Sequence, residues 1–356
     1  MTELTDFPSL ETPCVLIDLD RVETNLGRAQ AYADAHGLAL RPHVKTHKLP
    51  RFARRQVELG ASGVTCQKLG EAEVMADAGL DDILVTYNIL GQAKLDRLAA
   101  LHAMATITVA ADNDTVVDGY ARRFTDPTRP LRVVVECDTG AGRCGVQSPE
   151  AALALARRID AAPGLHFAGL MTYPPAGKTA EVGHWLTAAR DRLVQAGLAP
   201  QIVSNGGTPD MYRAHEVSAA TEHRPGTYIY SDRMQVGFGH GTLDDCALTV
   251  LATVVSRPTP DRAVIDAGSK ALAADTCAAP GHGHVVEYPD AVITALSEEH
   301  GIVDLTACAD RPPIGARLRV VPNHVCVVSN LFDEVHLVRD GRLEDTVPVA
   351  ARGRLA

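Results

Sequence analysis

The chain has 356 residues, of which 44 are Asp or Glu and 34 are Lys or Arg, so its formal net charge is −10. This acidic balance argues against a nucleic-acid partner, because a phosphate backbone is bound by clustered Lys and Arg. No apolar run reaches the roughly 18 residues of a membrane-spanning helix, and the N-terminus lacks the basic and apolar regions of a signal peptide, so we expect a cytoplasmic protein with no membrane partner.

Apolar strand candidates alternate with helical stretches from about residue 38 to about residue 245. Eight strands are predicted, at Leu38–Val44, Gly63–Gln67, Asp82–Tyr87, Thr106–Ala110, Arg132–Cys137, His166–Met171, Gln201–Ser204 and Val217–Thr221. The predicted helices include Arg51–Glu58, Leu69–Asp77, Gln92–Ala103, Pro149–Asp160 and Thr179–Ala196. This repetition predicts a parallel sheet, and its eight units favour an α/β fold of the (β/α)8 TIM-barrel type. A doubly wound open sheet is the alternative, although no GxGxxG motif follows an early strand.

After about residue 245 the pattern changes to short apolar runs separated by Gly, Pro and Asp. These predicted strands are Leu248–Val255, Arg262–Asp266, Arg317–Val321, Glu334–Val338 and Thr346–Val349, and Cys14–Asp18 forms one more before the barrel. The runs predict a second, mostly antiparallel β domain, because no long amphipathic helix lies between them. We therefore expect a barrel over 20–245 and a β domain made of 1–19 and 246–356.

Lys45 lies at or just beyond the end of the first predicted barrel strand, between His43 and the pair His47 and Lys48. Barrel enzymes place their chemistry at the carboxyl ends of the strands. A lysine there can form a Schiff base with an aldehyde if its surroundings favour the neutral amine. Taken alone, however, such a lysine is more often an ordinary surface residue of a loop.

Two glycine-containing segments follow the last predicted barrel strands: Ser204-Asn205-Gly206-Gly207-Thr208 and Gly226-Thr227. Their backbone N–H groups can approach an anion without obstruction by a Cβ atom. Barrels often bind phosphate after strands seven and eight, whereas a plain flexible turn is about equally frequent for such a motif alone. A phosphate site together with a Schiff-base lysine indicates pyridoxal phosphate (PLP) as cofactor.

His324 and Cys326 lie two positions apart in Pro322-Asn323-His324-Val325-Cys326. If this segment is a strand, the two side chains project on the same face. Imidazole and thiolate suit Zn²⁺, and two ligands completed by water or substrate would form an open catalytic site. From spacing alone, a half-buried His beside a core Cys is the more frequent case. The other seven cysteines are expected to be packing residues.

The chain resembles the fold-type III PLP enzymes, and within them the D-serine dehydratase and D-threonine aldolase group, over nearly its whole length. The blocks that carry the resemblance are, in chain order, Thr12–Asp18, Arg41–Lys48, Cys66–Lys68, Gly140–Gly145, Ser204–Thr208, Arg224–Tyr228, Asp266–Lys270, Glu298–Gly301 and Pro322–Cys326. Their number and their order support the functional interpretation of Lys45 and of the His324 and Cys326 pair.

The resemblance implies a homodimer with an active site at the boundary of the two domains, with Lys45 as the Schiff-base lysine. It implies a cofactor site formed by Lys45, Gln67, Arg143, Tyr173, Ser204, Asn205, Gly206, Gly207, Thr208, Arg224, Gly226, Thr227 and Tyr228. It also implies a divalent metal on His324 and Cys326. The His-x-Cys pair resembles the zinc-dependent dehydratases, whereas aldolase members more often carry His-x-Asp and use manganese or magnesium, so zinc is expected.

The activity implied is that of a lyase acting on D-3-hydroxy amino acids, with two possible outcomes. In dehydration, Lys45 removes the Cα proton and the metal assists the departure of hydroxide. In retro-aldol cleavage, the metal acidifies the β-hydroxyl group, and His43 or His300 takes its proton. Two alternatives stay open, an amino-acid racemase and a non-catalytic PLP-binding homeostasis protein. A racemase would need no metal, and a PLP carrier would not need the C-terminal domain.

One segment departs from the group's pattern. After Thr172-Tyr173, where many members carry a His-containing segment, this chain has Pro174-Pro175-Ala176-Gly177. The two prolines stiffen this loop. Because we expect the loop to border the substrate, the identity of the substrate is the property that the resemblance determines least.

Overall fold

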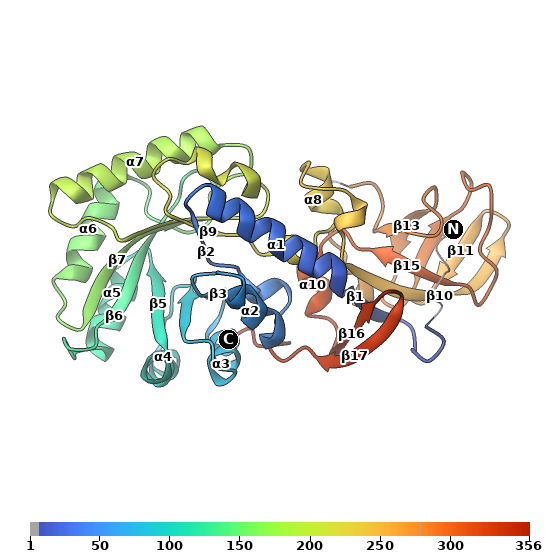
Figure 1. Ribbon diagram of the computed structural model, residues 1–356, viewed down its shortest axis with the longest axis horizontal. Helices are drawn as coiled ribbons and strands as arrows, with labels where there is room; N and C mark the ends of the chain where they lie inside the picture. Colours follow the sequence, from blue (N-terminus) through green and yellow to red (C-terminus); the bar gives the residue numbers. More distant parts are fainter. Residues whose placement is uncertain (1–6, 278) are drawn as a thin grey trace. The chain divides into compact units, whose positions relative to one another are not determined.

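A computed structural model describes residues 7–277 and 279–356, which form two compact units (Figure 1). The barrel unit comprises residues 28–45, 49–226 and 354–356. The described part of the β unit comprises residues 7–27, 46–48 and 227–353, without residue 278. The division of the chain into domains at 20–245, and at 1–19 with 246–356, stays a prediction.

The barrel unit contains eight parallel strands in the order β2-β9-β8-β7-β6-β5-β4-β3. Their bounds are β2 Ala39–Leu40, β3 Val64–Cys66, β4 Asp82–Val85, β5 Thr106–Ala111, β6 Leu131–Cys137, β7 Leu165–Thr172, β8 Ile202–Gly206 and β9 Glu222–Arg224. Between β2 and β3 the sheet is connected by one parallel bridge, from His43 to Thr65. The predicted TIM-like α/β fold is therefore confirmed.

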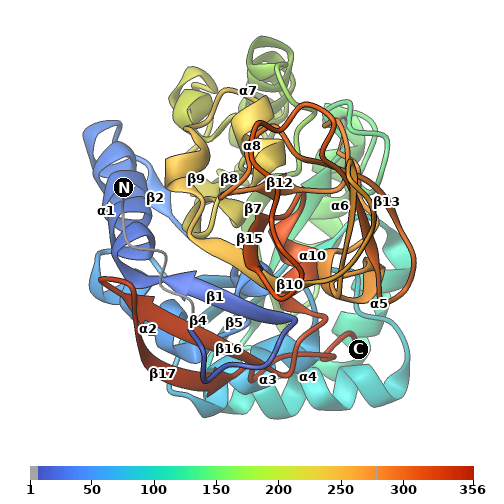
Figure 2. The ribbon, with the colours of Figure 1, turned by 90° about the vertical axis from the view of Figure 1, so that its right-hand side faces the viewer.

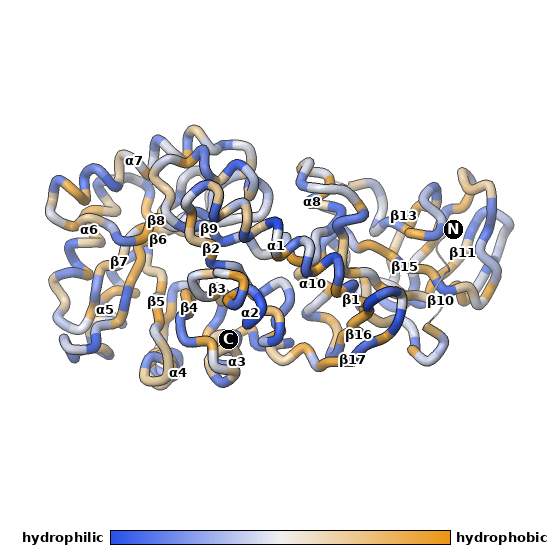
Figure 3. Tube along the Cα trace, in the orientation of Figure 1, coloured by the Kyte–Doolittle hydropathy of each residue, from blue (hydrophilic) through white to orange (hydrophobic). Residues whose placement is uncertain are grey.

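Helices follow most of these strands and cover the outside of the sheet (Figure 1). They are α2 Pro50–Glu58, α3 Leu69–Asp77, α4 Gln92–Met104, α5 Asp114–Arg123, α6 Pro149–Asp160 and α7 Thr179–Gln195, and α1 Leu19–Ala35 precedes β2. The predicted bounds of α3 and α6 are correct to the residue, whereas α1 and α5 were not among the predicted helices. Figure 3 shows hydrophobic segments along β5–β7, whose side chains are almost entirely buried.

Two strand predictions were wrong at one end of the parallel sheet, at β2 and β9. The first strand is only Ala39–Leu40, because Val44–Thr46 forms a 3-10 turn. The range Val217–Thr221 is not a strand: Ala220 N–H donates to Val217 O at 2.8 Å, which closes a turn instead. The strand β9 begins one residue later, at Glu222. Its three side chains are polar although they are buried, so a pattern of apolar residues does not predict this strand.

The β unit is built on one sheet in which six strands close into a ring, β10-β11-β14-β13-β12-β15, with β1, β16 and β17 continuing from β10 (Figure 2). The bounds are β1 Cys14–Asp18, β10 Leu248–Thr259, β11 Arg262–Ile265, β12 His284–Val285, β13 Val292–Leu296, β14 Gly301–Asp304, β15 Arg317–Val321, β16 Glu334–Arg339 and β17 Arg342–Pro348. All pairings are antiparallel except β1 with β16. The prediction of a mostly antiparallel second region is confirmed. Short helices α8 Arg233–Gly237, α9 Ser269–Leu272 and α10 Val325–Ser329 also belong to this unit.

A buried ion pair holds β2 against β9. Arg41 Nε lies 2.7 Å from Glu222 Oε2, and both side chains are less than 10% exposed. Arg41 Nη1 also contacts Asp82 Oδ1 at 2.7 Å.

We predict that Glu222→Gln lowers the free energy of unfolding by about 3–5 kcal/mol, because it leaves the buried guanidinium without its main countercharge. Urea denaturation measures this, with Glu73→Gln of the half-exposed Glu73–Arg97 pair as control; equal losses in both variants would contradict the prediction.

Candidate functional site

Lys45 lies in the 3-10 turn that follows β2, and its side chain is half-buried. Among the described residues, its amine has no hydrogen-bond or ion-pair partner. The backbone N–H of Lys45 approaches Nδ1 of His43 at 3.4 Å, and Nε2 of His43 lies 3.1 Å from Oε1 of Gln67. Burial and the charge of Lys45 lower the pKa of His43, so this imidazole is neutral. The barrel unit therefore presents an unpaired primary amine beside a neutral histidine.

The loop after β8 is shaped by Gly206 and Gly207. A Cβ atom on Gly206 would lie 2.7 Å from a guanidinium nitrogen of Arg224, and Gly207 has φ of +106°, a region that favours glycine. The hydroxyl of Thr208 accepts a hydrogen bond from Gly226 N–H at 3.1 Å, which ties this loop to the one after β9. The two glycine-containing segments therefore meet, as predicted.

Arg224 is the buried cation of this region. Its Nη2 donates to Thr172 O at 2.7 Å, and burial lowers its pKa to about 10, so the guanidinium keeps its charge at neutral pH. Three of the buried polar atoms that have no partner among the described residues lie on β8 and β9: Arg224 Nη1, His223 Nε2 and Asn205 Oδ1. Buried polar groups are normally hydrogen-bonded. These atoms, the glycine loop and the Lys45 amine fit a polar, phosphorylated cofactor such as PLP.

The hydroxyl of Ser204 has a hydrogen-bond partner, unlike the buried atoms of Arg224, His223 and Asn205 named above. Its hydroxyl donates to Glu222 Oε1, inside the ion-pair network of Arg41. The Ser204 hydroxyl is therefore part of the hydrogen-bond network that stabilises the barrel unit. The sequence predicts phosphate contact from the backbone N–H groups of this motif, and the Ser204 backbone begins that loop; its role in cofactor binding stays a prediction.

Arg143 and Tyr173 lie together at the edge of the same region. The guanidinium carbon of Arg143 lies 4.5 Å from the centre of the Tyr173 ring, and a Cβ atom on Gly207 would lie 3.6 Å from that ring. Arg143 also lies 3.6 Å from the buried carboxylate of Glu136, whose pKa is raised by burial. Tyr173 therefore borders the glycine loop, and the exposed Arg143 lies over the Tyr173 ring.

We expect the stability of the protein to depend on pH through His223. Burial and the charge of Arg224 lower the pKa of His223 from 6.5 to about 3. Below pH 6.5 the unfolded chain binds a proton here that the native chain does not, so stability present above pH 6.5 is lost toward pH 3, by about 1.4 kcal/mol per pH unit. We predict that His223→Gln reduces this slope by about one proton in urea denaturation between pH 4 and pH 6, whereas the exposed His184→Gln leaves it unchanged. An unchanged slope in His223→Gln would contradict the prediction.

His324 and Cys326 lie in the β unit, but not in a strand as predicted. The strand β15 ends at Val321, His324 is the residue that precedes α10, and Cys326 is in its first turn. His324 keeps an extended backbone, with φ −142° and ψ 101°, and the helix begins at the next residue, Val325. The imidazole nevertheless hydrogen-bonds the Cys326 thiol, and this bond is the main reason that the pKa of His324 rises to about 9. Cys326 Sγ also lies 3.2 Å from Oγ1 of Thr46, the residue that follows Lys45.

The other predicted residues of the β unit differ in their positions. Thr227 is buried, and its Oγ1 lies 3.6 Å from Cys326 Sγ. Tyr228 is buried in the turn Thr227–Ile229. His300 is exposed in the turn between β13 and β14, and no contact between it and His324 or Cys326 is found among the described residues. The β unit therefore groups Thr227 with Cys326 and leaves His300 apart.

Two residues near His324 were missed by the sequence interpretation. Asp275 Oδ2 lies 2.9 Å from Nδ1 of His324. Ligand atoms of Asp275, Cys277 and His324 all lie within 4.8 Å of one another. The only signal in the sequence is the Asp-x-Cys spacing, which repeats the His-x-Cys spacing, because 46 residues separate Cys277 from His324 along the chain.

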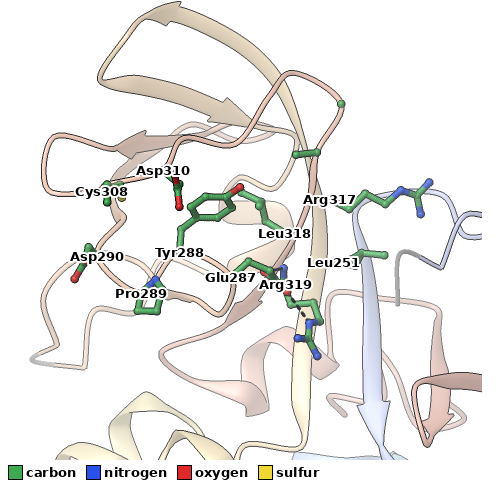
Figure 4. Close-up of a pocket in the computed structure, with 13 residues that line it drawn as sticks. Leu251, Glu287, Tyr288, Pro289, Asp290, Cys308, Asp310, Arg317, Leu318 and Arg319 are labelled. Carbon is green, nitrogen blue, oxygen red and sulfur yellow. Dashed lines mark hydrogen bonds and ion pairs between the residues drawn. The ribbon is translucent and has the colours of Figure 1, made fainter. Parts of the chain in front are cut away.

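The β unit also contains a cavity of about 600 Å³, shown in Figure 4. It is lined by residues including Glu287, Tyr288, Asp310, Arg317 and Arg319. Arg319 Nε is paired with Glu287 Oε1 at 2.7 Å, and Arg317 donates to Phe7 O. None of the predicted site residues lines this cavity, and its two arginines already have partners, so we assign it no role in the chemistry.

Comparison with known proteins supports the same family throughout. The family model of the alanine racemase N-terminal domain matches residues 17–234, and that of a serine dehydratase domain matches residues 247–338. A D-threonine aldolase of Arthrobacter sp. is 37% identical, over 97% of this chain and 93% of its own. This chain belongs to the D-threonine aldolase and D-serine dehydratase family. The resemblance seen in the sequence is therefore confirmed.

Solved structures agree with this assignment. The crystal structure of D-threonine aldolase from Filomicrobium marinum matches with a TM-score of 0.91 and 31% identity, over 98% of both chains. D-threo-3-hydroxyaspartate dehydratase from Delftia sp. HT23 matches with a TM-score of 0.87 and 30% identity, over 96% of this chain and 98% of that one. Both relatives are lyases, and the family implies PLP and a metal. Among the described residues, no helix is long and apolar enough to cross a membrane.

Proposed function

We propose that the protein is a PLP- and divalent-metal-dependent lyase acting on D-3-hydroxy amino acids. The observation that carries this proposal is the unpaired amine of Lys45 in a unit that also contains the two joined glycine segments and the unpartnered Nη1 of Arg224. An amine, an anion-binding loop and a buried cation are the groups that PLP needs.

The residues that would hold the cofactor follow from their positions. Backbone N–H groups of Gly206, Gly207 and Gly226, with the hydroxyl of Thr208, would bind the phosphate. Thr227 and Tyr228, which continue the second segment, would extend it. Bound PLP withdraws electrons from the Cα atom of an amino acid. Arg224 would face the ring and, being cationic, would make this withdrawal moderate.

Two basic groups could move protons here, and they differ. Lys45 has a free amine and would take the Cα proton in dehydration. A neutral His43 that donates from Nε2 to Gln67 Oε1 accepts the backbone N–H of Lys45 at Nδ1, so both ring nitrogens are engaged. We therefore propose that His43 and Gln67 position Lys45, while the exposed His300 stays a candidate base for retro-aldol cleavage.

The metal site is proposed on His324 and Cys326, with zinc as the metal because imidazole and thiolate are ligands that it prefers. One structure of the Delftia dehydratase is of a cysteine variant in a metal-free form, and another is of a histidine variant. The two altered residues are separated by the same spacing as His324 and Cys326. This parallel supports the pair as ligands.

Retro-aldol cleavage is the first expected outcome. Arthrobacter and Paracoccus relatives named as aldolases, at 37% and 34% identity, are more similar to this chain than the 32% identical dehydratase. Dehydration is the second candidate because Cys326 provides a thiolate, as in zinc-dependent dehydratases. Alanine racemases match at 12–19% identity, which supports the fold alone. A homodimer and a cytoplasmic location remain predictions.

Product analysis tests the proposal. The purified protein, supplied with PLP and Zn²⁺, is incubated with D-threonine and with D-threo-3-hydroxyaspartate. Retro-aldol cleavage gives glycine and an aldehyde, whereas dehydration gives a keto-acid and ammonia. We expect glycine as the main product. Failure to convert any D-3-hydroxy amino acid, with PLP and zinc both shown to be bound, would refute the proposed activity.

A further inference from the structure

We propose that Cys277 is a third protein ligand of the metal ion held by His324 and Cys326, and that Asp275 orients His324 toward that ion. The inference rests on the proposed function in one respect, the presence of a metal at His324. It changes the expected role of Cys277, which the sequence alone assigns to packing.

The first support is the distance between the donor atoms. Ligand atoms of Asp275, Cys277 and His324 lie within 4.8 Å of one another. Zinc binds sulfur at about 2.3 Å and imidazole nitrogen at about 2.0 Å, so neighbouring ligands of a tetrahedral ion lie roughly 3.5 Å apart. The three donor atoms therefore lie near the spacing that ligands of one ion need. Because His324 already hydrogen-bonds Cys326, three donors are gathered around one imidazole.

The second support is the attachment of the loop that carries Cys277. Asn323, the residue before His324, is 1% exposed. Its side-chain amide donates to Asp275 O at 3.0 Å and to Gly281 O at 2.9 Å, while its Oδ1 accepts from Arg233 at 2.7 Å. The two ends of the loop are thus fastened to the residue adjacent to His324, which keeps Cys277 near the site.

The third support is the backbone of Cys277, which has φ of +47°. This left-handed conformation suits glycine and costs a residue with a Cβ atom roughly 1 kcal/mol or more. Such strain accompanies functional positions more often than packing ones. It also makes Cys277→Gly a mild substitution, because glycine adopts this conformation without strain.

Asp275 has a different role from Cys277. Its Oδ2 lies 2.9 Å from Nδ1 of His324, so the Nδ1–H group donates to this carboxylate. Nε2 is then the ring nitrogen that would bind a metal, in place of a proton. A carboxylate that binds the distal nitrogen of a metal-bound histidine fixes both the tautomer and the ring orientation. Asp275 is accordingly a positioning residue.

The resulting donor set is one imidazole and two thiolates, with a fourth position open. Catalytic zinc sites are typically built in this way, from three protein ligands and one exchangeable position. Two thiolates also favour zinc over manganese and magnesium, which prefer oxygen ligands. Cys277 would therefore determine which metal this protein selects.

Cobalt substitution of the full-length protein tests the number of thiolate ligands. The intensity of the thiolate-to-cobalt charge-transfer band is measured with Co²⁺ as the probe, and zinc affinity is measured by competition with a chelator. We expect Cys277→Gly and Cys277→Ser each to halve the band and to weaken zinc binding about tenfold or more. Cys326→Ser should halve the band as well, and Cys144→Ser, an exposed thiol of the barrel unit, should change neither quantity.

The outcomes separate this inference from the proposed function. If both Cys277 variants keep the wild-type band and zinc affinity while Cys326→Ser loses the whole band, Cys277 is not a ligand and the two-ligand site stands. If the wild-type protein shows no thiolate band with Co²⁺, neither Cys326 nor Cys277 is a metal ligand. The metal site of the proposed function is then refuted together with this inference. A halved band in both Cys277 variants, with unchanged folding by circular dichroism, supports the inference.

Discussion

Lys45→Ala is expected to lose at least about a thousandfold in turnover of D-3-hydroxy amino acids, because the chain then lacks the proposed covalent attachment for PLP and the amine proposed to take the Cα proton. Lys45→Arg should lose as much, because a guanidinium keeps the positive charge but does not replace the amine. Steady-state kinetics on D-threonine with added PLP measure the loss. Lys178→Ala, at an exposed lysine, should retain full activity and serves as the control.

The attachment itself is measured without turnover. Borohydride reduction of the PLP-loaded protein, followed by peptide mass analysis, should place the cofactor on the peptide that contains Lys45. In Lys45→Ala the modified peptide should be absent. Recovery of the cofactor on Lys48 or Lys68 in the wild-type protein would contradict the assignment, even if the variant were inactive.

Removal of the metal is the second large expected effect. Dialysis against a chelator should lower turnover about a hundredfold or more, because a bound Lewis acid contributes several kcal/mol of stabilisation to an oxygen that gains charge. Zn²⁺ should restore the activity of the wild-type protein. In His324→Ala no added metal should restore it, since the imidazole ligand is missing.

A control separates metal loss from cofactor loss. PLP content, measured from absorbance after denaturation, should stay unchanged in the chelated protein and in His324→Ala, because the residues proposed to hold PLP are other side chains. Full activity of the chelated protein, with metal content shown to be negligible, would contradict the metal-dependent mechanism.

The fold was predictable where local signals agree. Helix α6 has its predicted bounds, and its start is sharply defined because Ser148 caps the first turn, accepting from Ala151 N–H, and Pro149 occupies the first position. Strand β1 is a continuous apolar run. Strand β9 was missed because its buried side chains are polar, and burial of Glu222 depends on Arg41, which lies far away in the sequence. A pattern of apolar residues cannot predict a buried ion pair between residues that lie far apart in the sequence.

The residues of the candidate site also differ in whether local sequence signals could predict them. Lys45 and the glycine segments are predicted site residues because of their places at the ends of strands, and the structure joins the two segments through Thr208 and Gly226. The hydrogen bond of the Ser204 hydroxyl to Glu222 was not predictable, because Glu222 belongs to another strand. Asp275 and Cys277 were missed because hydrogen bonds formed on folding, from Asn323 and between Asp275 and His324, bring their loop to His324. Sequence patterns report neighbours along the chain, whereas these contacts are made by folding.

The most direct test of the central claim, a D-specific lyase, follows the fate of D-threonine and L-threonine by proton NMR in separate incubations with the zinc- and PLP-loaded protein. We predict that D-threonine is consumed, with stoichiometric glycine and acetaldehyde or with 2-oxobutanoate and ammonia, and that L-threonine remains unchanged. Inversion of either substrate at Cα, with no cleavage product, would show a racemase instead and would contradict the account.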